Sequence, residues 1–379
     1  MTAVGTYAGN AGDSPAHTSS VDYFFNTALP VSPEDKPCTE WIGAIDSDWD
    51  HANNWSLSTP DSSTSAIIPD ISNSKNVFPV ISSLAECSNL IVENGATLDI
   101  AENGMLTIRG IFLNNGGTTI HSDATGTGSF IDNGYITGTG NIYDERFLTD
   151  TTWHYVSVPV DDPTAAVFLG MYVMEWDEPS GQWSYITDPA QVLDTDMEGY
   201  AVWTNEISTV QFTGDRNTGP KSIAASFTSG ATHDNKGFNF AGNPYPSALD
   251  WNVDDGSGWS RTVGNIDLSL YIWNGEVGNY GSYVKDAAGG TNDVDNVIPP
   301  HQGFFVSCSS PTGTLGVNNG ARMHGNQNIL KSGENEDESF LLLKVEGNGY
   351  ADEAMFRIDE QATTGFDHSR DARDRKSVV

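Results

Sequence analysis

Three blocks of sequence recur in the same order between residue 151 and about residue 320. The matched pairs are YVSVPVDDPTA (155–165) with FAGNPYPSALD (240–250), EWDEPSGQWSYI (175–186) with IWNGEVGNYGSYV (272–284), and EGYAVW (198–203) with QGFFVS (302–307). The second pair keeps a constant offset of 97 residues, which aligns Trp176 with Trp273. Three blocks in one order make a chance match unlikely, so we interpret this region as a diverged internal duplication.

Each copy reads as a strand, a proline turn, a crossing segment, an aromatic hairpin and a strand that begins with glycine. Antiparallel strands with one apolar face bury that face most simply against a second sheet. We therefore predict a duplicated β-sandwich module over residues 151–332, built as one sandwich or as a pair of small ones. ESFLLLKVEGNGYADEAMFRI (338–358) predicts one more hairpin. Since a lone hairpin is marginal in water, residues 333–379 are predicted to start a truncated C-terminal sandwich.

Asn-Gly pairs punctuate the sequence that precedes the duplication. They fall between short alternating apolar strands, at residues 94/95, 103/104, 115/116 and 133/134. Turns at this spacing suit strands stacked coil upon coil, so we predict a short parallel β-solenoid of roughly four coils with about 20 residues each. A meander of hairpins is the alternative, because Asn-Gly also suits two-residue hairpin turns. The 39 glycines and the frequent Thr, Val and Ile in short runs place the whole chain in the all-β class.

The solenoid is predicted to span residues 41–150 and to begin with WIGAIDSDWDHANNW (41–55). The three tryptophans of this stretch either cap the open end of the solenoid or present a face that stacks on sugars, and large aromatic residues ahead of a β-domain favour the cap. Residues 1–40 are rich in Gly, Ser, Thr, Ala and Pro and poor in apolar positions. This composition predicts a disordered tail or a linker.

Charge narrows the range of partners. Acidic residues outnumber basic residues 51 to 17, which gives a formal net charge of −34. This charge repels phosphate backbones and anionic membranes, so we expect a neutral glycan, a cation or a protein as the partner and no nucleic acid. The same charge is also typical of proteins from saline habitats. No run of about 18 apolar residues occurs, so no membrane insertion is expected.

Three cysteines, Cys38, Cys87 and Cys308, are too few for a disulfide framework and match no zinc or redox spacing, although one Cys38–Cys87 bridge is compatible with the sequence. The first 40 residues lack the regions of a signal peptide, so either an export signal has been removed or the chain starts inside a longer protein. DRKSVV (374–379) reverse-translates to a match with a common sequencing-adapter read. We expect genuine coding sequence to stop near Arg373 and the native protein to continue.

Several stretches resemble large secreted surface proteins that are exported by the type IX secretion system. They include WIGAIDSDWDHANNW, CSNLIVENGATLDI, TGTGSFIDNGYITGTGNI, ERFLTDTTWHYVSVPV, GNPYPSALDWN, IPPHQGFFV, GNGYADEAMFRI and ATTGFDHSRDA, and the resemblance covers residues 41–373. It implies a solenoid-like stalk that leads into β-sandwich modules, followed by a C-terminal sorting domain that this chain lacks. It also implies an extracellular or cell-surface location and an adhesin-like role, without any reaction.

Motifs that would indicate an enzyme do not occur in the sequence: there is no G-x-S-x-G elbow, no H-E-x-x-H and no phosphate-binding glycine loop. A solenoid invites comparison with polysaccharide lyases and hydrolases, whose active sites need clustered acids on one face. Asp99 and Glu102 could reach the separation that paired carboxylates require. We expect the acids of the solenoid to be solvated turn residues instead.

Calcium is the ligand that the sequence supports best. DSDWD places Asp46, Asp48 and Asp50 at alternate positions, where carboxylate oxygens can converge on one Ca²⁺. The stretch is no EF-hand, because the central glycine and the terminal acid of that loop are missing. TNDVDN supplies Asp293 and Asp295 as further candidate calcium ligands, and NVDDGSG is a similar loop.

A neutral glycan is the other candidate ligand. Flat aromatic rings stack on sugars without any need for charge, and the candidate residues are Asp250, Trp251, Trp273 and Tyr280. Tyr172, Met174 and Trp176 of the first hairpin, however, alternate in phase along one strand, as side chains do when they fill a sandwich core. Because the proline turn of GNPYPS is duplicated, we interpret that turn as scaffold.

Together these features predict a non-enzymatic, structural or adhesin-like extracellular region of a larger secreted surface protein, with Ca²⁺ as the one candidate cofactor. Two alternatives belong to other classes. One is a glycan-binding accessory region of a secreted polysaccharide-degrading enzyme. The other is a subunit of a surface filament, in which a strand from one chain completes the sandwich of the next.

Overall fold

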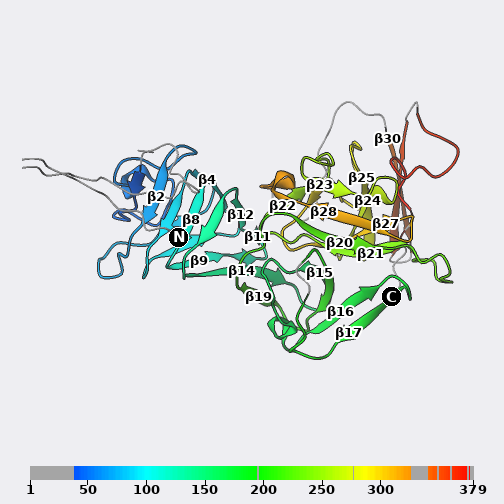
Figure 1. The fold of residues 1–379 in the computed structure, drawn as a ribbon, viewed down its shortest axis with the longest axis horizontal. Coiled ribbons are helices and arrows are strands. Elements are labelled where there is room, and N and C mark those ends of the chain that lie inside the picture. The colour runs from blue at the N-terminus through cyan, green and yellow to red at the C-terminus, as the bar shows by residue number, and fades with distance from the viewer. Residues whose placement is uncertain are drawn as a thin grey trace, which may run out of the picture. The chain divides into compact units, whose positions relative to one another are not determined.

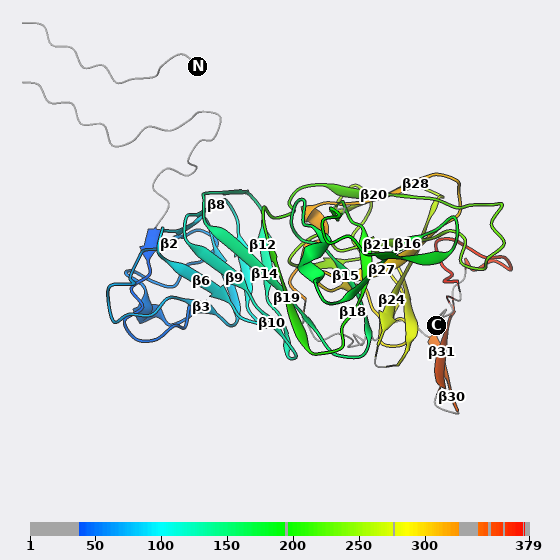
Figure 2. The same ribbon diagram turned by 90° about the horizontal axis from the view of Figure 1, so that it is seen from below.

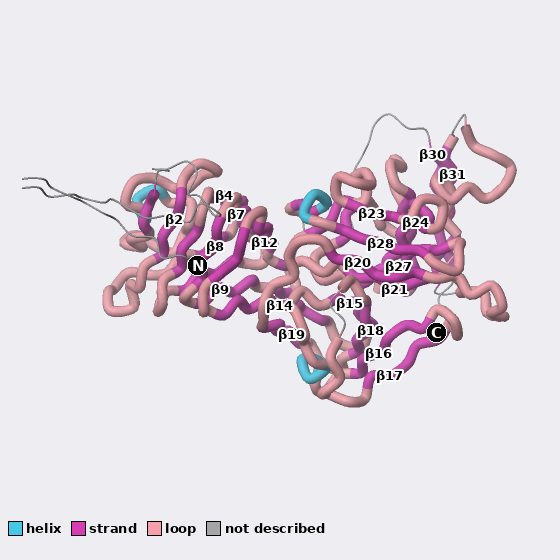
Figure 3. The backbone as a smooth tube through the Cα atoms, viewed as in Figure 1, coloured by secondary structure: helices cyan, strands magenta, loops and turns pink. Residues whose placement is uncertain are grey.

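The computed structural model describes residues 38–193, 196–275, 277–325, 340–347, 350–358, 361–373 and 375. Within these residues the fold is all-β, as predicted, and the helical segments are three short 3₁₀ turns, η1 (Ala52–Asn54), η2 (Ala165–Phe168) and η3 (Asn319–Ala321) (Figure 3). None of the described helices is long and apolar enough to cross a membrane. The predicted tail lies outside the described residues except for 38–40, and so does DRKSVV except for Arg375.

Residues 38–144 form a parallel β-solenoid of about four turns, which confirms the prediction (Figure 1, blue to green). Each turn contributes strands to three sheets, which are the three faces of the solenoid. The first face consists of β1 (Cys38–Glu40), β2 (Ser65–Ile68), β5 (Leu90–Val92), β8 (Ile111–Asn114) and β13 (Tyr135–Thr137). The second consists of β3 (Val80–Ile81), β6 (Thr97–Ile100), β9 (Gly117–Ile120) and β14 (Asn141–Leu148), and the third of β4 (Leu84–Cys87), β7 (Met105–Ile108) and β12 (Ser129–Asp132). A small hairpin of β10 (Ser122–Asp123) and β11 (Gly126–Thr127) is inserted between β9 and β12.

The Asn-Gly pairs lie at corners between faces, which excludes the meander of hairpins. The pair at 94/95 joins β5 to β6, and the pair at 133/134 joins β12 to β13. Glycine is required where one coil lies directly on the next. A Cβ on Gly134 would lie 2.0 Å from the carbonyl oxygen of Gly110, which belongs to the preceding coil.

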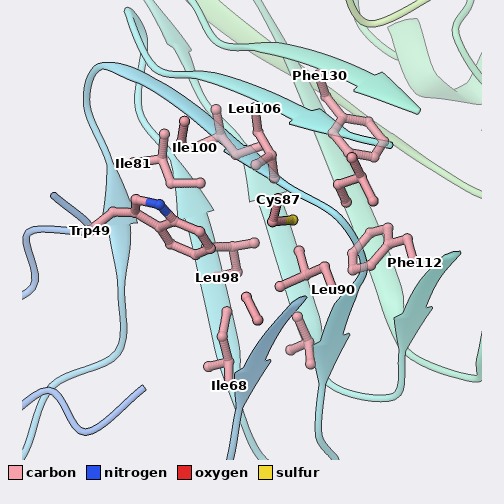
Figure 4. Close-up of a cluster of buried hydrophobic side chains, with 14 of the residues drawn as sticks. Trp49, Ile68, Ile81, Cys87, Leu90, Leu98, Ile100, Leu106, Phe112 and Phe130 are labelled. Atoms are coloured by element: carbon pink, nitrogen blue, oxygen red, sulfur yellow. The ribbon is translucent and has the colours of Figure 1, made fainter. Parts of the chain in front are cut away.

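The solenoid core is filled by the inward-facing residue of every second strand position (Figure 4). Trp41, Trp49 and Trp55 belong to the same core, with at most 3% of each side chain exposed. The ring of Trp55 meets the other two edge to face, at centroid distances of 5.0 and 4.7 Å. The tryptophans are therefore packed inside, without a free face for a sugar. Cys87 lies in this core and Cys38 on a different face, and both are free thiols.

The two copies of the duplicated module form two sheets with the same strand order, and all neighbouring strands are antiparallel. The first sheet is β15 (Trp153–Ser157), β18 (Gly199–Trp203), β16 (Tyr172–Asp177) and β17 (Gln182–Ile186). The second is β21 (Phe238–Gly242), β27 (Gly303–Cys308), β24 (Ile266–Asn274) and β25 (Asn279–Val284). The registers also coincide, since Tyr155 pairs with Ala201 and the equivalent Phe240 pairs with Phe305. The structure thus contains the duplication that the sequence shows.

The equivalence extends to strands that the sequence comparison did not match. In the first copy β14 pairs with β19 (Ser208–Thr213), and in the second copy β20 (Lys221–Ala225) pairs with β28 (Gly313–Val317). Both pairs are antiparallel and flank their copies in the same way. The remaining strands of the second copy are β22 (Ala248–Asp250), β23 (Trp259–Arg261), β26 (Val297–Ile298) and β29 (Arg322–Met323).

The two sheets pack against each other through an interior of aromatic residues, and each has a second buried face. The outer face of the first sheet covers a core that includes Val156, Val202 and Phe212. The outer face of the second sheet covers a core that includes Leu270 and Trp251. Strands β18, β21 and β27 are therefore buried on both sides, which accounts for their nearly continuous burial, whereas the edge strand β17 is exposed or half-buried along its length.

Reciprocal contacts show that an approximate twofold axis relates the two copies. Val156 of the first copy forms a β-bridge with Gln302 of the second. Ala241, the equivalent of Val156, forms a β-bridge with Glu198, the equivalent of Gln302 in the first copy. An interface in which residue i meets j while j′ meets i′ is the mark of isologous packing. The duplicated module is therefore an internal pseudo-dimer.

Ser157 and Gly242 occupy equivalent positions and face each other at this axis. The main-chain N–H of Ser157 donates to the carbonyl oxygen of His301 at 3.0 Å, and that of Gly242 donates to the carbonyl oxygen of the equivalent Met197 at 2.7 Å. A Cβ on Gly242 would lie 2.2 Å from the Cβ of Ser157. Only one of the two positions can therefore carry a side chain.

Strand β14 belongs to the solenoid and to the module at once. Residues 141–144 pair in parallel with β9, and residues 143–148 pair antiparallel with β19. The backbone ladder therefore runs unbroken from β3 through β6, β9 and β14 to β19 (Figure 2). The predicted boundary at residue 150 falls just after the strand that joins the two parts.

A second junction joins the third face of the solenoid to the second copy. Arg322 donates from Nη1 to the Asp132 carboxylate at 2.6 Å, from Nη2 to the carbonyl oxygen of Phe130 at 2.7 Å, and from Nε to the Ser247 hydroxyl at 2.9 Å. Arg322 and Asp132 are both buried. Because removal of either ion would leave the other buried without its partner, this pair fixes the geometry of the junction.

His324 lies at the same junction, between two hydroxyl groups of the solenoid. Its Nε2 is 2.8 Å from Thr107 Oγ1, and its Nδ1 is 2.8 Å from Ser129 Oγ. Burial lowers the pKa of His324 to about 4, and the charge of Arg322 adds to the shift. The imidazole is therefore neutral at neutral pH and serves as a hydrogen-bonded link.

The hairpin expected within 338–358 is confirmed by β30 (Phe340–Gly347) and β31 (Tyr350–Arg357). Its turn residues 348 and 349 lie outside the described part of the chain. Several of its apolar side chains are exposed, with values of 56% for Leu341 and 70% for Val345. The two strands pair with each other and with no other described strand.

The contact on the twofold axis predicts the effect of one added methyl group. Gly242→Ala should lower the free energy of unfolding by roughly 1 to 3 kcal/mol, because the new Cβ overlaps that of Ser157. Adding Ser157→Gly should recover only part of the loss, because the new Cβ would still lie 2.8 Å from the carbonyl oxygen of Glu198. Gly117→Ala is the matched control, since its Cβ would be 3.7 Å from the nearest side-chain atom. Urea unfolding measures all three, and a Gly242→Ala protein as stable as the wild type would contradict the axis contact.

Acidification should weaken the fold through His324. The unfolded chain takes up a proton as the pH falls through 6.5, while the folded-state pKa of His324 is about 4. Stability is therefore complete above pH 6.5 and is lost as the pH falls from 6.5 towards 4. Between pH 7.5 and pH 4.5 the loss from this one group should be about 2 kcal/mol. His324→Gln keeps both hydrogen-bonding atoms and should show a correspondingly smaller loss in urea unfolding, whereas equal losses would exclude His324 as the source.

Candidate functional site

The carboxylates of the predicted calcium loop DSDWD bond to their own neighbours. The main-chain N–H of Asp48 donates to Asp46 Oδ1 at 3.1 Å, and that of Asp50 donates to Asp48 Oδ1 at 3.0 Å. Asn54 Nδ2 donates to Asp46 Oδ1 at 2.7 Å, and the Ser83 hydroxyl donates to the Asp50 carboxylate. The bond from Asn54, with that from Asp48, lowers the pKa of Asp46. These acids therefore cap successive turns.

The second calcium loop separates the two acids that the sequence grouped. Asp295 is half-buried and accepts a hydrogen bond from the main chain of Val297 at 2.8 Å, whereas Asp293 is exposed. Burial raises the pKa of Asp295, and the charge of Asp250 raises it further. The structure thus brings Asp295 near Asp250, which the sequence assigned to a glycan site. Among the described residues, no group of three or more His, Cys, Asp or Glu side chains is arranged to hold a metal ion.

The acids of the third loop, NVDDGSG, pair with cations of the chain itself. Asp254 lies 3.0 Å from Lys285 Nζ, and Asp255 lies 2.9 Å from Arg261 Nη1. The guanidinium of Arg261 also lies over the ring of Trp251, at 4.1 Å from its centroid. Both carboxylates already have a positively charged partner.

The three aromatic residues among the glycan candidates lie in two different interiors, and Asp250 is half-buried. Trp251 is fully buried in the core of the second copy, and its Nε1 donates to the carbonyl oxygen of Leu268 at 2.8 Å. Trp273 is half-buried and Tyr280 is buried, both between the two sheets. Asp250 accepts a hydrogen bond from Asn296 Nδ2 at 2.7 Å. The structure therefore does not gather these side chains on one exposed surface.

On the second face of the solenoid, His121 lies between two carboxylates. Its Nε2 is 3.4 Å from Asp99 Oδ1, and its Nδ1 is 3.1 Å from Glu145 Oε2. The hydrogen bond to Asp99, with that to Glu145, raises the pKa of His121 to about 9. The imidazole is therefore protonated at neutral pH and cannot serve as a general base there. Asp99 is thus engaged with His121 rather than placed as a free catalytic partner of Glu102.

We call the interior between the two copies the aromatic layer. Its rings are those of Trp153, Tyr155, Trp176, Trp183, Phe238, Phe240, Tyr271, Trp273, Tyr280 and Phe305. Tyr155 lies near its middle, with its ring 4.9 Å from that of Phe240 and 6.0 Å from that of Phe305. The hydroxyls of Tyr155 and Tyr280 are 2.6 Å apart and buried, and burial raises the pKa of Tyr155 well above its ordinary value.

One end of the aromatic layer encloses the guanidinium of Arg375. The four rings around it are those of Trp176 on β16, Phe238 on β21, Tyr280 on β25 and Phe305 on β27, which we call the cage. The Arg375 Cζ atom lies 5.1, 4.6, 4.8 and 3.4 Å from their centroids, respectively. Only 6% of Arg375 is exposed, and its Nε and Nη1 have no hydrogen-bond partner among the described residues. The ring faces are thus the main contacts of this cation.

A cavity of about 720 Å³ lies beside the cage. It is enclosed by β25, by β31 and by the C-terminal segment 362–373, and Arg375 itself lines it. Asn279 Nδ2 donates to Asp352 Oδ1 at 3.2 Å across it, and the Arg373 main chain donates to the Tyr271 hydroxyl at 2.7 Å. The hairpin and the C-terminal segment thereby close over one end of the aromatic layer.

A comparison with protein-family models gives one match. The model described as Domain of unknown function (DUF8693) covers residues 40–378. The chain belongs to this family. No curated protein and no solved structure matches. The DUF8693 match takes in the solenoid, both copies and most of DRKSVV, whose origin stays a prediction that the source DNA tests.

The cage of this DUF8693 chain could not be located from its sequence. The constant offset of 97 singled out Trp176 and Tyr280 as hairpin aromatics, but no pattern linked them to Phe238 or to Arg375. The cage unites strands from both copies, and its guest lies 70 residues beyond Phe305. The sequence does show an arginine close to the end of a strongly acidic chain, but this does not indicate which residues contact it.

The geometry of the acidic loops predicts the response to calcium. The melting temperature should agree within about 1 °C in 5 mM EDTA and in 5 mM CaCl₂, because the carboxylates of Asp46, Asp48 and Asp50 bond within their own loop and Asp293 is separated from Asp295. MgCl₂ at the same ionic strength is the control, since any divalent salt screens a charge of −34. A rise of several degrees with calcium alone in differential scanning calorimetry would restore the calcium site.

Proposed function

We propose that this chain is a non-enzymatic structural region, adhesin-like in its role, of a larger protein that acts outside the cell. The unbroken ladder from β3 to β19 carries this proposal. A strand shared by the solenoid and the module leaves no hinge in that ladder, and such a connection suits a stiff spacer. The buried Arg322–Asp132 pair adds a second fixed connection between the solenoid and the second copy.

Two histidines of the solenoid and its junction support a role without catalysis. His121 is held protonated between two carboxylates, and His324 is held neutral between two hydroxyls. A general base or acid works best with a pKa near the working pH and with access to substrate. Neither imidazole has such a pKa, and both take part in contacts within the fold.

The proposed location rests on the sequence. The resemblance to surface proteins of the type IX secretion system favours an extracellular address, and the charge of −34 favours a protein or neutral-glycan partner over nucleic acid. Tethered surface proteins need segments that hold binding modules at a distance. A solenoid joined to a pseudo-dimer by continuous pairing suits that task.

Pulling on the full chain in optical tweezers tests the spacer. Residues 38–325 should unfold as one event with a gain in contour length approaching about 1,000 Å, because each part holds the other in place. Arg322→Met should split this event in two, since it leaves Asp132 buried without its ion pair.

The matched control for this experiment is Arg109→Met. Arg109 pairs with Glu86 on the exposed surface of the solenoid, so its loss should leave the single event intact. Wild-type unfolding in many small steps at low force would contradict the spacer.

A further inference from the structure

We propose that the cage is a binding site for a guanidinium group, and that Arg375 occupies it as an intramolecular guest. The site is distinct from the junctions on which the spacer depends. It shares Tyr280 with the predicted glycan residues but differs in its ligand, because four rings around a buried guanidinium suit a flat cation. The class of ligand is an arginine side chain or a small guanidinium compound.

The arrangement of the rings carries the proposal. The guanidinium lies against the face of Phe305, at 3.4 Å, while Trp176, Phe238 and Tyr280 surround it at 4.6 to 5.1 Å. A cation within about 6 Å of an aromatic centroid is attracted by the negative face of the ring, and the attraction grows as water is removed. Four rings around one cation at 6% exposure satisfy both conditions.

Comparison with the other buried arginines separates the cage from ordinary packing. Among the described residues these are Arg146, Arg216, Arg261 and Arg322. Each of the four has a side-chain hydrogen bond to a carboxylate, carbonyl or amide oxygen. The described contacts of the Arg375 side chain are with rings. A buried guanidinium is thus held here by a surface that offers no fixed partner for its Nε and Nη1.

The pseudo-twofold axis shows that the cage is built on one side alone. The equivalent of Phe305, which makes the closest contact, is Ala201 in the first copy. The location that the pseudo-twofold axis relates to the cage therefore lacks the ring on which the guanidinium lies. Because the remainder of the layer is aromatic in both copies, this one difference creates a cation site at one end and plain packing at the other.

The adjoining cavity gives an external guanidinium a way to reach the cage. Its lining is mixed in charge, because Asp352, Glu353 and Asp371 lie beside Arg357, Arg370 and Arg373. The net charge of −34 over the whole chain favours the approach of cations. Arg375 lies within DRKSVV, whereas the four cage residues lie in the duplicated module. The site is therefore a property of the module, whichever arginine fills it.

Removal of the guest tests the site directly. Arg375→Ala should bind N-acetyl-L-arginine methylamide with a change in tryptophan fluorescence, because Trp176 lines the cage. Binding should be at least tenfold tighter than to the wild type, whose own guest competes at high effective concentration. The lysine analogue should bind at least tenfold more weakly, and the neutral citrulline analogue should not bind. Equal binding of citrulline and arginine would overturn cation recognition, and so would a folded Arg375→Ala protein that binds neither.

Two variants serve as matched controls in the same titration. Arg375→Met fills the cage without charge and should stay closed to the probe. Arg109→Ala removes a guanidinium that pairs with Glu86 on the solenoid, outside the cage and its cavity, so it should behave as the wild type. Tight binding of the probe by Arg109→Ala would show that the loss of any arginine is enough for binding, and would overturn the proposal.

The wild-type chain provides a second test, which does not depend on whether a variant with an empty cage folds. In an arginine side-chain NMR spectrum, the Nε–H resonance of Arg375 should be shifted upfield by the surrounding rings and disappear in Arg375→Lys. A resonance at the position of an exposed arginine would overturn the proposal. Adding guanidinium chloride or the peptide acetyl-Gly-Arg-Gly-amide should move this resonance to the exposed position. If the peptide displaces Arg375 at a concentration at least tenfold lower than guanidinium chloride does, the ligand is an arginine within a polypeptide. If both act at the same concentration, the ligand is a small guanidinium compound.

Discussion

The rest of the structure depends on strand β14, because it must pair in parallel on one side and antiparallel on the other. Its inward-facing residues follow the change of surroundings along the strand. Ile142 belongs to the solenoid core and Leu148 to the core of the first copy. Between them lie Asp144 and Arg146, both buried, and Asp144 faces His301 Nε2 at 3.2 Å. Two apolar cores thus meet across a short polar border on one strand, and His301 from the second copy reaches into that border.

The aromatic layer differs in chemistry from the cores on either side of it. The outer core of the first copy is rich in valine, whereas the space between the copies is filled by rings. Tyrosine and tryptophan rings carry polar groups, and the faces of aromatic rings attract cations. Branched aliphatic side chains do neither. The paired hydroxyls of Tyr155 and Tyr280 and the guanidinium of Arg375 are examples. An interior of this kind can enclose a cation without a counter-ion, which an aliphatic core could not do at comparable burial.

Local rules of the sequence were enough for the class of fold but not for its connections. Asn-Gly pairs predicted the corners, since glycine is needed wherever coils stack, and the constant offset predicted a duplicated antiparallel module. The role of β14 was missed because NIYDERFL reads as a charged strand at the end of a solenoid, with no sign of its second neighbour. The pairing of Arg322 with Asp132 joins residues 190 positions apart, beyond any local pattern. The sequence makes Trp251 a candidate glycan residue, and the structure places it in a core, because periodicity does not distinguish a buried tryptophan from one on a binding surface.

The position of Ser157 opposite Gly242 has a consequence for how such a molecule can diversify. In a dimer of identical chains, each substitution at a twofold axis appears twice and meets itself, so a serine there would collide with a serine. Joining both copies in one chain removes that restriction, and each half can change while the other adapts. Phe305 and Ala201 are also equivalent positions, and they can differ for the same reason. Covalent duplication thus allows a symmetric scaffold to acquire an asymmetric surface without giving up the packing that holds its halves together.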